Sequence, residues 1–287
     1  MRVHDLRDAQ VSVVGLGLMG GSLAAALRGN CKSVVGIARR CETIEYALTH
    51  GLVDHGTTDL ADGVRHADVV VLATPVRVII QQLGEIGPLL PGCLLMDLGS
   101  TKRQIVAEMA RLPDHVQPLG GHPMCGKEVS GLEAADPALY QDRTFILTPL
   151  ERTSGAALAL GRALAKAIGA QPLVLEAQRQ DFLVATLSHL PYLLACALVA
   201  TADATTSADP AAWEIVAGGY RDTSRLAGSD VTMMTDILLT NRAEVLKALG
   251  VYARQLHDLT CLVETSDEEE MQMVLGRFRE ERLRMFP

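Results

Sequence analysis

The feature that most constrains this chain is a glycine-rich turn between a strand and a helix near the N-terminus. The segment VSVVGLGLMGGSLAAAL places Gly15, Gly17 and Gly20 in the spacing G-x-G-x-x-G, directly after a β-branched run at 11–14. Short apolar runs then alternate with helical patterns as far as about residue 175. Strands separated by helices of this length predict a Rossmann-type α/β fold, a doubly wound parallel sheet covered on both faces.

This alternation also predicts the order of the elements. Strands are expected at 11–14, 34–37, 68–73, 93–98, 144–147 and 172–175, and helices at 19–28, 43–50, 78–86 and 102–112, with another helix between the last two strands. After about residue 176 the strand signal ends, and helices with blurred boundaries are expected at 178–203, 211–227, 231–248, 242–265 and 267–284. The change near Glu176 predicts an α/β domain over residues 1–175 and an all-helical domain over residues 176–287.

Composition and charge exclude several classes of protein. Hydrophobic residues make up 48% and charged residues 21% of the chain, which is typical of a soluble globular protein. A formal net charge of −8 disfavours nucleic acid as a partner, because binding to phosphate backbones requires a basic surface. The six cysteines form no CxxC pair and no metal-ligand cluster, and the N-terminus has no apolar signal segment. We therefore expect reduced thiols, no metal and a cytoplasmic location.

One apolar segment has the length of a membrane span. Residues 182–202 contain 21 positions without a formal charge, roughly the number a bilayer requires. Ser188, His189 and Pro191 lie near its middle, and no basic cluster flanks it. These features favour a helix buried on all sides, in a domain core or a subunit interface, over a membrane span.

The glycine turn predicts a dinucleotide site. Gly15 would permit the tight turn, Gly17 would let the backbone approach a pyrophosphate, and Gly20 would allow close packing of helix against strand. The free N–H groups at the helix start, at Leu18 and Met19, would receive the phosphate charge. The alternative is a glycine turn that binds nothing.

The second strand ends in GIARR, which bears on the choice of cofactor. An NAD-binding fold places an acidic residue about 20 positions after the glycines, but here the corresponding residue is Ala38, followed by Arg39 and Arg40. Guanidinium groups bind a 2′-phosphate, so the sequence favours NADP over NAD. The alternative is that these arginines begin a solvated helix. Thr74 and Pro75 follow the third strand and are further candidates for cofactor contact, or form a plain turn.

Three further clusters hold residue types that catalysis uses. They are DLGSTK at 97–102, at the end of a strand, GGHPMCG at 120–126, which predicts a glycine-rich loop around His122, and GGYRDTSR at 218–225, in the helical half. Together with GLGLMGGS and SHLP, these motifs occur in the order found in the prephenate and arogenate dehydrogenases of tyrosine biosynthesis. The chain resembles this family from about residue 10 to 265, with the greater similarity to the NADP-dependent arogenate type. The resemblance implies a small-molecule substrate, oxidative decarboxylation with hydride transfer to the nicotinamide, and a homodimer formed by the helical domain.

The resemblance also implies roles for individual residues. His122 would be the base at the substrate hydroxyl, a role suited to an unperturbed pKa near 6.5. Ser100 would bond both His122 and that hydroxyl, and Arg225 would bind the side-chain carboxylate. Each residue also has an alternative role that is only structural. His122 would be a structural histidine, Ser100 would cap the helix that begins near Lys102, and Arg225 would form a surface ion pair. Cys125 is interpreted as a packing residue.

Two positions depart from the family pattern. Many prephenate-using members read HD and SHLPH where this chain has Gln180-Asp181 and Ser188-His189-Leu190-Pro191-Tyr192. We expect Gln180, His189 and Tyr192 to lie near the substrate, so the loss of two histidines favours arogenate or dual use. Asp230 is a weaker candidate for binding the ammonium group of arogenate, because it is also placed to cap the next helix.

Two other functions remain open at this stage. A β-hydroxyacid or 6-phosphogluconate-type dehydrogenase shares the glycine-rich opening and a helical second domain. Those enzymes use a lysine on the interdomain helix, and residues 178–203 contain none. A non-catalytic NADP-binding regulator would bind cofactor without turnover.

Overall fold

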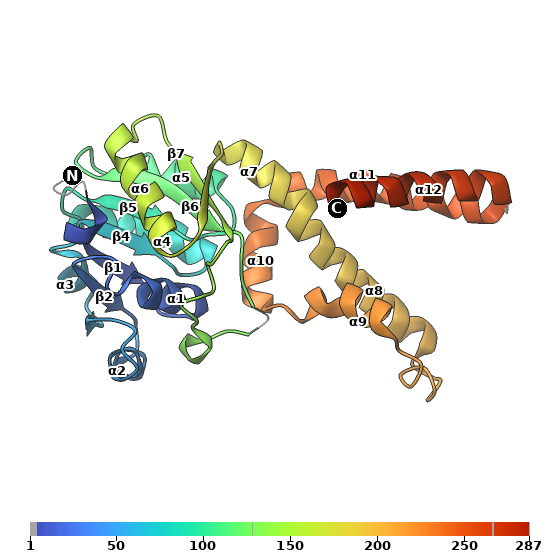
Figure 1. Cartoon of the computed structure of the whole chain (residues 1–287), viewed down its shortest axis with the longest axis horizontal. Coiled ribbons are helices and arrows are strands. Elements are labelled where there is room, and N and C mark those ends of the chain that lie inside the picture. The colour runs from blue at the N-terminus through green and yellow to red at the C-terminus, as the bar shows by residue number, and fades with distance from the viewer. Residues whose placement is uncertain (1–4, 128, 266, 287) are drawn as a thin grey trace. The chain divides into compact units, whose positions relative to one another are not determined.

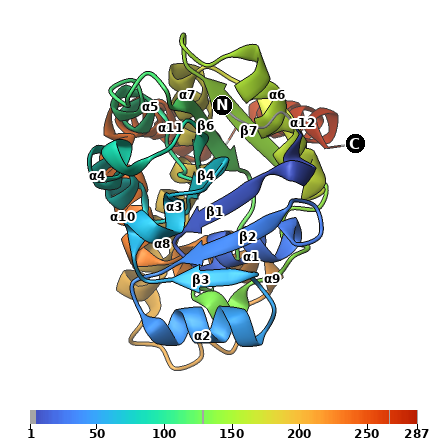
Figure 2. The ribbon, with the colours of Figure 1, turned by 90° about the vertical axis from the view of Figure 1, so that its left-hand side faces the viewer.

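The computed structural model describes residues 5–127, 129–265 and 267–286. Its N-terminal part is built on an eight-stranded sheet with the order β3-β2-β1-β4-β5-β6-β7-β8. The strands β1 to β7 are labelled in Figures 1 and 2. The strands are β1 (Gln10–Val14), β2 (Ser33–Ile37), β3 (His55–Thr57), β4 (Val69–Leu72), β5 (Leu94–Asp97), β6 (Gln117–Pro123), β7 (Thr144–Pro149) and β8 (Gln171–Val174). The predicted Rossmann-type architecture is confirmed.

The prediction of a parallel sheet is right for the first six strands and wrong for the last two. β7 runs antiparallel to β6, and β8 is parallel to β7. The described part of the connection between β6 and β7 contains one short 3₁₀ turn, Leu132–Ala134, and no crossover helix. A parallel return needs a crossover of a dozen or more residues, usually a helix, so the chain returns antiparallel here.

Two strands were not expected. β3 has only three residues, His-Gly-Thr, and lies at the sheet edge, so it lacks a hydrophobic pattern. β6 reads QPLGGHP, and its glycines and prolines predicted a loop around His122. In the structure β6 is almost wholly buried, and His122 is therefore held by a central strand.

Helices cover both faces of the sheet, and alternate residues of each strand face opposite sides. α1, α2 and α6 contribute buried residues to one hydrophobic cluster, and α3, α4 and α5 contribute to the other. In β4, for example, Val69 and Val71 belong to the first cluster, while Val70 and Leu72 belong to the second. The helices are α1 (Leu18–Leu27), α2 (Cys41–Thr49), α3 (Leu60–Val64), α4 (Val76–Ile86), α5 (Arg103–Met109) and α6 (Gly155–Ala167).

The described residues after 176 form helices and turns, as predicted, with different boundaries. The elements are α7 (Ala177–Val184), a π-helical turn (Ala185–His189), α8 (Leu190–Thr206), α9 (Gly218–Ser224), a 3₁₀ turn (Arg225–Gly228), α10 (Val231–Thr240), α11 (Arg242–Thr265) and α12 (Glu268–Met285). The π turn interrupts the single helix expected at 178–203, because Pro191 lacks the N–H that a continuous α-helix requires. The helix expected at 211–227 is shorter, since α9 begins only at Gly218.

The chain divides into two compact units, one ending at Arg242 and one beginning at Ala243. The first unit contains the sheet together with α7 to α10, and the second contains α12 and nearly all of α11. The predicted domain boundary near Glu176 lies inside the first unit and stays a prediction.

The helix Ala177–Thr206 is long and apolar enough to cross a membrane by length and composition alone. Only 28% of its most apolar window is buried within the chain, and Leu187 is 73% exposed. The expected burial inside a domain core is therefore wrong. The alternative, burial in a subunit interface, remains a prediction.

Candidate active site

The glycine turn after β1 has the geometry that a dinucleotide needs. Gly15 has a φ of +100°, and its N–H donates to the carbonyl of Ile37 at 2.8 Å. A Cβ on Gly20 would lie 1.9 Å from the Gly15 carbonyl oxygen, so the helix can approach the strand only with glycine there. A Cβ on Gly17 would meet no atom within 4 Å. Gly17 therefore faces open space, available to a ligand.

The N-terminus of α1 differs from those of α4 and α5. The N-cap residue of α1 is Gly17, which has no side chain to cap the helix, and the first turn contains no acidic residue. At α4 the N–H of Arg77 donates to Asp236 (3.1 Å), and at α5 the N–H of Lys102 donates to Asp181 (2.7 Å). Helix N-termini attract anions, so α1 alone of the three has no carboxylate bonded to it among the described residues. This arrangement fits the pyrophosphate of a dinucleotide.

Arg39 and Arg40 follow β2 and are exposed. Within the described residues neither guanidinium has a hydrogen bond or an ion pair. Arg40 is the N-cap residue of α2, so the helix-start interpretation stays open beside the phosphate-binding one. Ala38, at the position of the acidic residue in NAD-binding folds, is half-buried.

Thr74 lies against the glycine turn. A Cβ on Gly15 would be 2.8 Å from the Thr74 methyl group, and the Thr74 hydroxyl donates to Gln82 Oε1 at 2.7 Å. Pro75 is the N-cap residue of α4. The structure therefore brings Thr74 to the predicted cofactor site.

A buried ion pair joins the end of β5 to the start of α5, and a backbone hydrogen bond links it to β6. The Asp97 carboxylate pairs with the Lys102 ammonium and accepts the N–H groups of Gly99 (2.7 Å) and Gly121 (3.0 Å). Both charged side chains are fully buried. Burial raises the pKa of Asp97 and lowers the pKa of Lys102, while the ion pair opposes both shifts. The sequence motif DLGSTK contains both residues but did not reveal this pairing.

His122 lies on β6 next to this ion pair. Burial, followed by the charges of Lys102 and His189, lowers its pKa from 6.5 to about 3, which corrects the expectation of an unperturbed pKa. Its Nδ1 is buried without a hydrogen-bond partner among the described residues. Such a group is costly unless a ligand or water completes it, so the neutral ring has an open hydrogen-bonding position for an incoming ligand.

Ser100 is held by a residue of the helical part. Gln180 Nε2 on α7 donates to the Ser100 carbonyl at 3.3 Å, while the buried Gln180 Oε1 has no partner among the described residues. Ser100 does not cap α5, because the Asp181 carboxylate accepts the N–H groups of Lys102 (2.7 Å) and Arg103 (2.9 Å). The structural alternative for Ser100 is therefore wrong.

His189 ends the π-helical turn and is buried, which lowers its pKa to about 4. The Asn241 amide lies 3.3 Å from His189 Nδ1 and donates to the Asp181 carbonyl at 2.7 Å. Asp181 and Asn241 are functional candidates that sequence reasoning missed. Their partners lie far away in the sequence, so no local signal identified them.

The remaining predicted residues belong to other elements of the helical part. Tyr192, on α8, lies beside Cys196, and burial followed by that thiol raises the pKa of its hydroxyl. Arg225 is exposed in the 3₁₀ turn after α9. Asp230 caps α10 by accepting the N–H of Met233 at 2.7 Å, as its structural alternative predicted.

Two residues in and just after the GGHPMCG cluster remain. Burial raises the pKa of Cys125 to about 11, so its thiol stays protonated and is no nucleophile. Glu128 lies outside the described residues.

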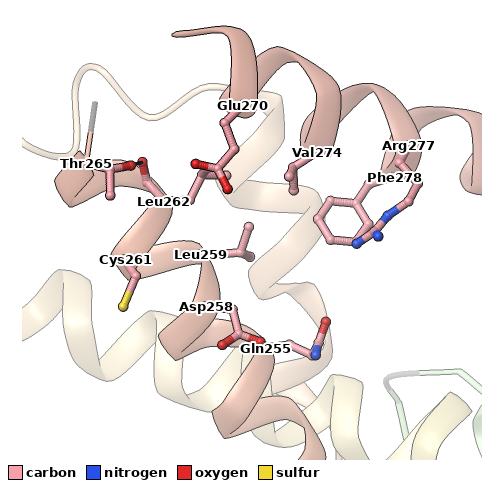
Figure 3. Close-up of a pocket in the computed structure, with 10 residues that line it drawn as sticks. All are labelled: Gln255, Asp258, Leu259, Cys261, Leu262, Thr265, Glu270, Val274, Arg277 and Phe278. Atoms are coloured by element: carbon pink, nitrogen blue, oxygen red, sulfur yellow. Dashed lines mark hydrogen bonds between the residues drawn. The ribbon is translucent and has the colours of Figure 1, made fainter. Parts of the chain in front are cut away.

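The C-terminal unit contains a separate hollow between α11 and α12, with a volume of about 360 Å³ (Figure 3). Asp258, Glu270 and Phe278 are among its lining residues, and no predicted site residue is. The described residues contain no group of three or more His, Cys, Asp or Glu side chains that could hold a metal ion.

Comparisons with known proteins give a consistent result. Residues 23–174 match the family model of the prephenate dehydrogenase nucleotide-binding domain, and residues 176–277 match that of the prephenate dehydrogenase dimerization domain. A prephenate dehydrogenase of Bacillus subtilis is 33% identical over 275 residues, covering 94% of this chain and 74% of the relative. A cyclohexadienyl dehydrogenase of Zymomonas mobilis is 30% identical over 276 residues, covering 94% and 92%.

Solved structures point to the same family. The prephenate dehydrogenase of Aquifex aeolicus, in complex with hydroxyphenyl propionate and NAD⁺, has a TM-score of 0.88 at 30% identity, covering 96% of this chain and 98% of that one. The arogenate dehydrogenase of Synechocystis has a TM-score of 0.84 at 29% identity, covering 96% and 99%. A 3-hydroxyisobutyrate dehydrogenase of Mycobacterium tuberculosis, at 18% identity and a TM-score of 0.59, shares the fold alone.

Proposed function

Because the chain belongs to the prephenate and arogenate dehydrogenase family, we propose that it oxidises and decarboxylates a cyclohexadienyl acid, arogenate in preference to prephenate, with NADP. The observation that carries this proposal is a pair of buried polar atoms without partners among the described residues, His122 Nδ1 and Gln180 Oε1. Both belong to the group of polar side chains around Ser100 and Lys102 at the carboxyl ends of β5 and β6. Substrates bind at this edge of open α/β sheets.

His122 is the proton acceptor in this proposal. The substrate C4 hydroxyl loses its proton to the neutral imidazole, the C4 hydrogen leaves as hydride, and the ring carboxylate leaves as carbon dioxide while the ring becomes aromatic. The nicotinamide, when bound, accepts the hydride. The pKa of about 3 describes His122 without substrate. The negative charge of a bound dicarboxylate would favour the protonated ring and strengthen the base.

Ser100 and Arg225 orient the substrate. Ser100 bonds the reacting hydroxyl together with His122, and its own position is fixed by the bond from Gln180 to its carbonyl. Lys102 is committed to Asp97, so it is not the cation for the substrate side chain. Arg225 takes that role, with a guanidinium that matches a carboxylate.

Gln180 supports arogenate as the substrate. Its amide nitrogen donates to the Ser100 carbonyl, so Oε1 is the atom left without a partner. A flipped amide would place two oxygens against each other. The ammonium of arogenate can donate to Oε1, whereas the ketone of prephenate is an acceptor and leaves it unpaired. His189 and Tyr192 complete the proposed substrate environment.

NADP is the proposed cofactor because of the residues after β2. Gly15, Gly17, Leu18, Met19 and Gly20 bind the pyrophosphate, with Thr74 and Pro75 beside them. Ala38 removes the carboxylate that would repel a 2′-phosphate, and the exposed Arg39 and Arg40 attract it.

We also propose a homodimer formed through residues 176–287, with residues 1–175 as the dinucleotide domain. Support comes from the match to a dimerization domain and from the exposed apolar side chains of the helix 177–206, such as Phe182 and Leu187. Burying these side chains against a second copy would remove a large apolar surface from water.

The test is the initial rate of reduced-cofactor formation with arogenate and prephenate, each with NADP and NAD. We expect the largest kcat/KM with arogenate and NADP. Gln180→His, which restores the residue of many prephenate-using members, should raise the prephenate-to-arogenate ratio about tenfold, the equivalent of one hydrogen bond. Oxidation of neither substrate with either cofactor would refute the proposal.

A further inference from the structure

Asp181 of α7 contacts two elements that carry predicted site residues. One is the N-terminus of α5, just after Ser100, and the other is Asn241, beside His189. Asp181 is fully buried, and its two carboxylate oxygens accept the first N–H groups of α5, from Lys102 (2.7 Å) and Arg103 (2.9 Å). α5 directly follows the turn that carries Ser100, so this contact fixes the end of that turn. Asp181 is 79 residues away from Lys102 in the sequence, and the contact is thus a tertiary one.

The backbone of Asp181 belongs to a second contact. Its carbonyl accepts the Asn241 amide at 2.7 Å, and the same amide nitrogen lies 3.3 Å from His189 Nδ1. An amide nitrogen only donates, so His189 Nδ1 must be the acceptor, and the proton of the neutral ring must lie on Nε2. Asp181 and Asn241 together therefore set the position and the tautomer of His189.

The opposite end of α5 is also fixed by a charged side chain. The Arg152 guanidinium donates to the carbonyls of Met109 (3.2 Å) and Leu112 (3.0 Å), at and just beyond the end of the helix. A carboxylate at the N-terminus and a cation at the C-terminus both complement the helix dipole. α5 is therefore held at both ends. Loss of the Asp181 contacts would release its N-terminus, and the Ser100 turn directly before it would shift.

We propose that Asp181 is a positioning residue that holds Ser100 and His189 in fixed positions relative to each other. The inference rests on the proposed function, since it assigns these two side chains to the substrate. Asp181 itself contacts neither substrate nor cofactor. It acts through the α5 N-terminus on one side and through Asn241 on the other.

Asp236 provides a matched control. It is a buried carboxylate of α10 that accepts the N–H of Arg77 (3.1 Å) at the N-terminus of α4. Both carboxylates bind N–H groups at a helix N-terminus, Asp181 two and Asp236 one, and Asp236 also lies 3.8 Å from the Arg77 guanidinium. The turn before α4 carries the proposed cofactor residues Thr74 and Pro75 but no proposed catalytic residue. Loss of either cap should cost similar stability, whereas only Asp181 should affect the geometry of the reaction.

The experiment compares Asp181→Asn with Asp236→Asn in the full chain. Both variants should lower Tm by about 2–4 °C, because a neutral amide oxygen binds an N–H group more weakly than a carboxylate does. Asp181→Asn should lower kcat about 10–100-fold, as a misplacement of about 1 Å does, with the KM for NADP unchanged. It should also weaken binding of hydroxyphenyl propionate about tenfold. Asp236→Asn should keep kcat within about threefold. A normal kcat in Asp181→Asn, or an equal loss in both variants, would overturn the proposal.

A second measurement does not depend on turnover. In protein labelled with ¹⁵N-histidine, NMR should show His189 as a single tautomer, protonated on Nε2, in the wild type. Asn241→Ala removes the donor to Nδ1 and should give a mixture of tautomers, whereas Asp181→Asn keeps the backbone carbonyl that orients Asn241 and should keep the single tautomer. A mixture in the wild type, or a single tautomer in Asn241→Ala, would overturn the contact between Asn241 and His189 as a positioning device. If the wild type oxidises neither substrate, the proposed function fails, and the tautomer measurement still decides whether Asn241, bonded to the Asp181 carbonyl, positions His189.

Discussion

The two halves of the sheet edge are built in different ways. On the half proposed to bind the cofactor, after β1, β2 and β4, the candidate groups are backbone and exposed side chains: Gly17 faces open space, and Arg39 and Arg40 are exposed. On the half proposed to be catalytic, after β5 and β6, the polar groups are buried, as His122 and Lys102 illustrate. One edge of the sheet thus contains an exposed region beside a buried cluster of polar side chains.

This difference shows how each half achieves its geometry. The cofactor half needs little outside support, because a turn and a helix N-terminus supply its donors. The catalytic half depends on Gln180, Asp181 and Asn241, whose contacts cross long stretches of sequence. Buried polar groups need satisfied partners, so this half requires the helical part to be in place. Changes on one half should therefore leave the other half intact.

The largest expected effect is on the catalytic half. His122→Asn should lower kcat by about 10²–10⁴-fold, as loss of a general base does, with the affinity for NADP unchanged. Steady-state kinetics together with a calorimetric titration of NADP would measure both quantities. A wild-type kcat would remove His122 from the mechanism, and a matching loss of NADP affinity would show that the two halves are not separable.

A pair of glycine variants tests the cofactor half. Gly20→Ala places a methyl group 1.9 Å from the Gly15 carbonyl and should lower the free energy of unfolding by about 3 kcal/mol. Gly17→Ala meets nothing within 4 Å of its Cβ and should change that free energy by less than about 1 kcal/mol.

The same pair separates folding from binding. Gly17→Ala should nevertheless weaken NADP binding at least about tenfold, because the methyl group occupies the path of the pyrophosphate. Urea unfolding and NADP titration would provide the two readouts. Normal NADP affinity in a folded Gly17→Ala protein would place the pyrophosphate elsewhere.

A smaller effect is expected from the arginine after β2. Arg39→Ala should weaken NADP binding about tenfold and leave NAD binding nearly unchanged, because only NADP carries the 2′-phosphate. Glu42→Ala, an exposed change on the first turn of α2, serves as a control and should not weaken binding of either cofactor. Equal losses for NADP and NAD in Arg39→Ala would assign Arg39 a structural role.

The last prediction concerns pH and the buried histidines. The folded-state pKa values of His122 (about 3) and His189 (about 4) lie below the unfolded value of 6.5. Between these values the unfolded chain binds more protons, so stability falls as the pH decreases below about 6.5, by up to about 1.4 kcal/mol per unit for each histidine. Urea midpoints at pH 7, 6 and 5 should fall less steeply in His122→Asn. An unchanged slope would show that His122 is not held neutral by the fold.

The sequence predicts the cofactor half better than the catalytic half, for a physical reason. Gly15, Gly17 and Gly20 act through local geometry, which their spacing encodes. The strand β6 was expected to be a loop, yet its glycines have tertiary causes: a Cβ on Gly121 would lie 2.4 Å from the Asp97 carbonyl oxygen. The lowered pKa of His122 and the capping role of Asp181 likewise depend on neighbours that only the fold brings together.

The most direct test of the account measures both products of the reaction in one assay. The wild-type protein would be supplied with NADP and with arogenate that carries a ¹³C label in its ring carboxylate, and NADPH and labelled carbon dioxide would be followed together. We predict equal molar amounts of NADPH and labelled carbon dioxide. In His122→Asn the rates of formation of both products should fall by the same factor. Formation of NADPH without labelled carbon dioxide, or formation of neither, would contradict the account.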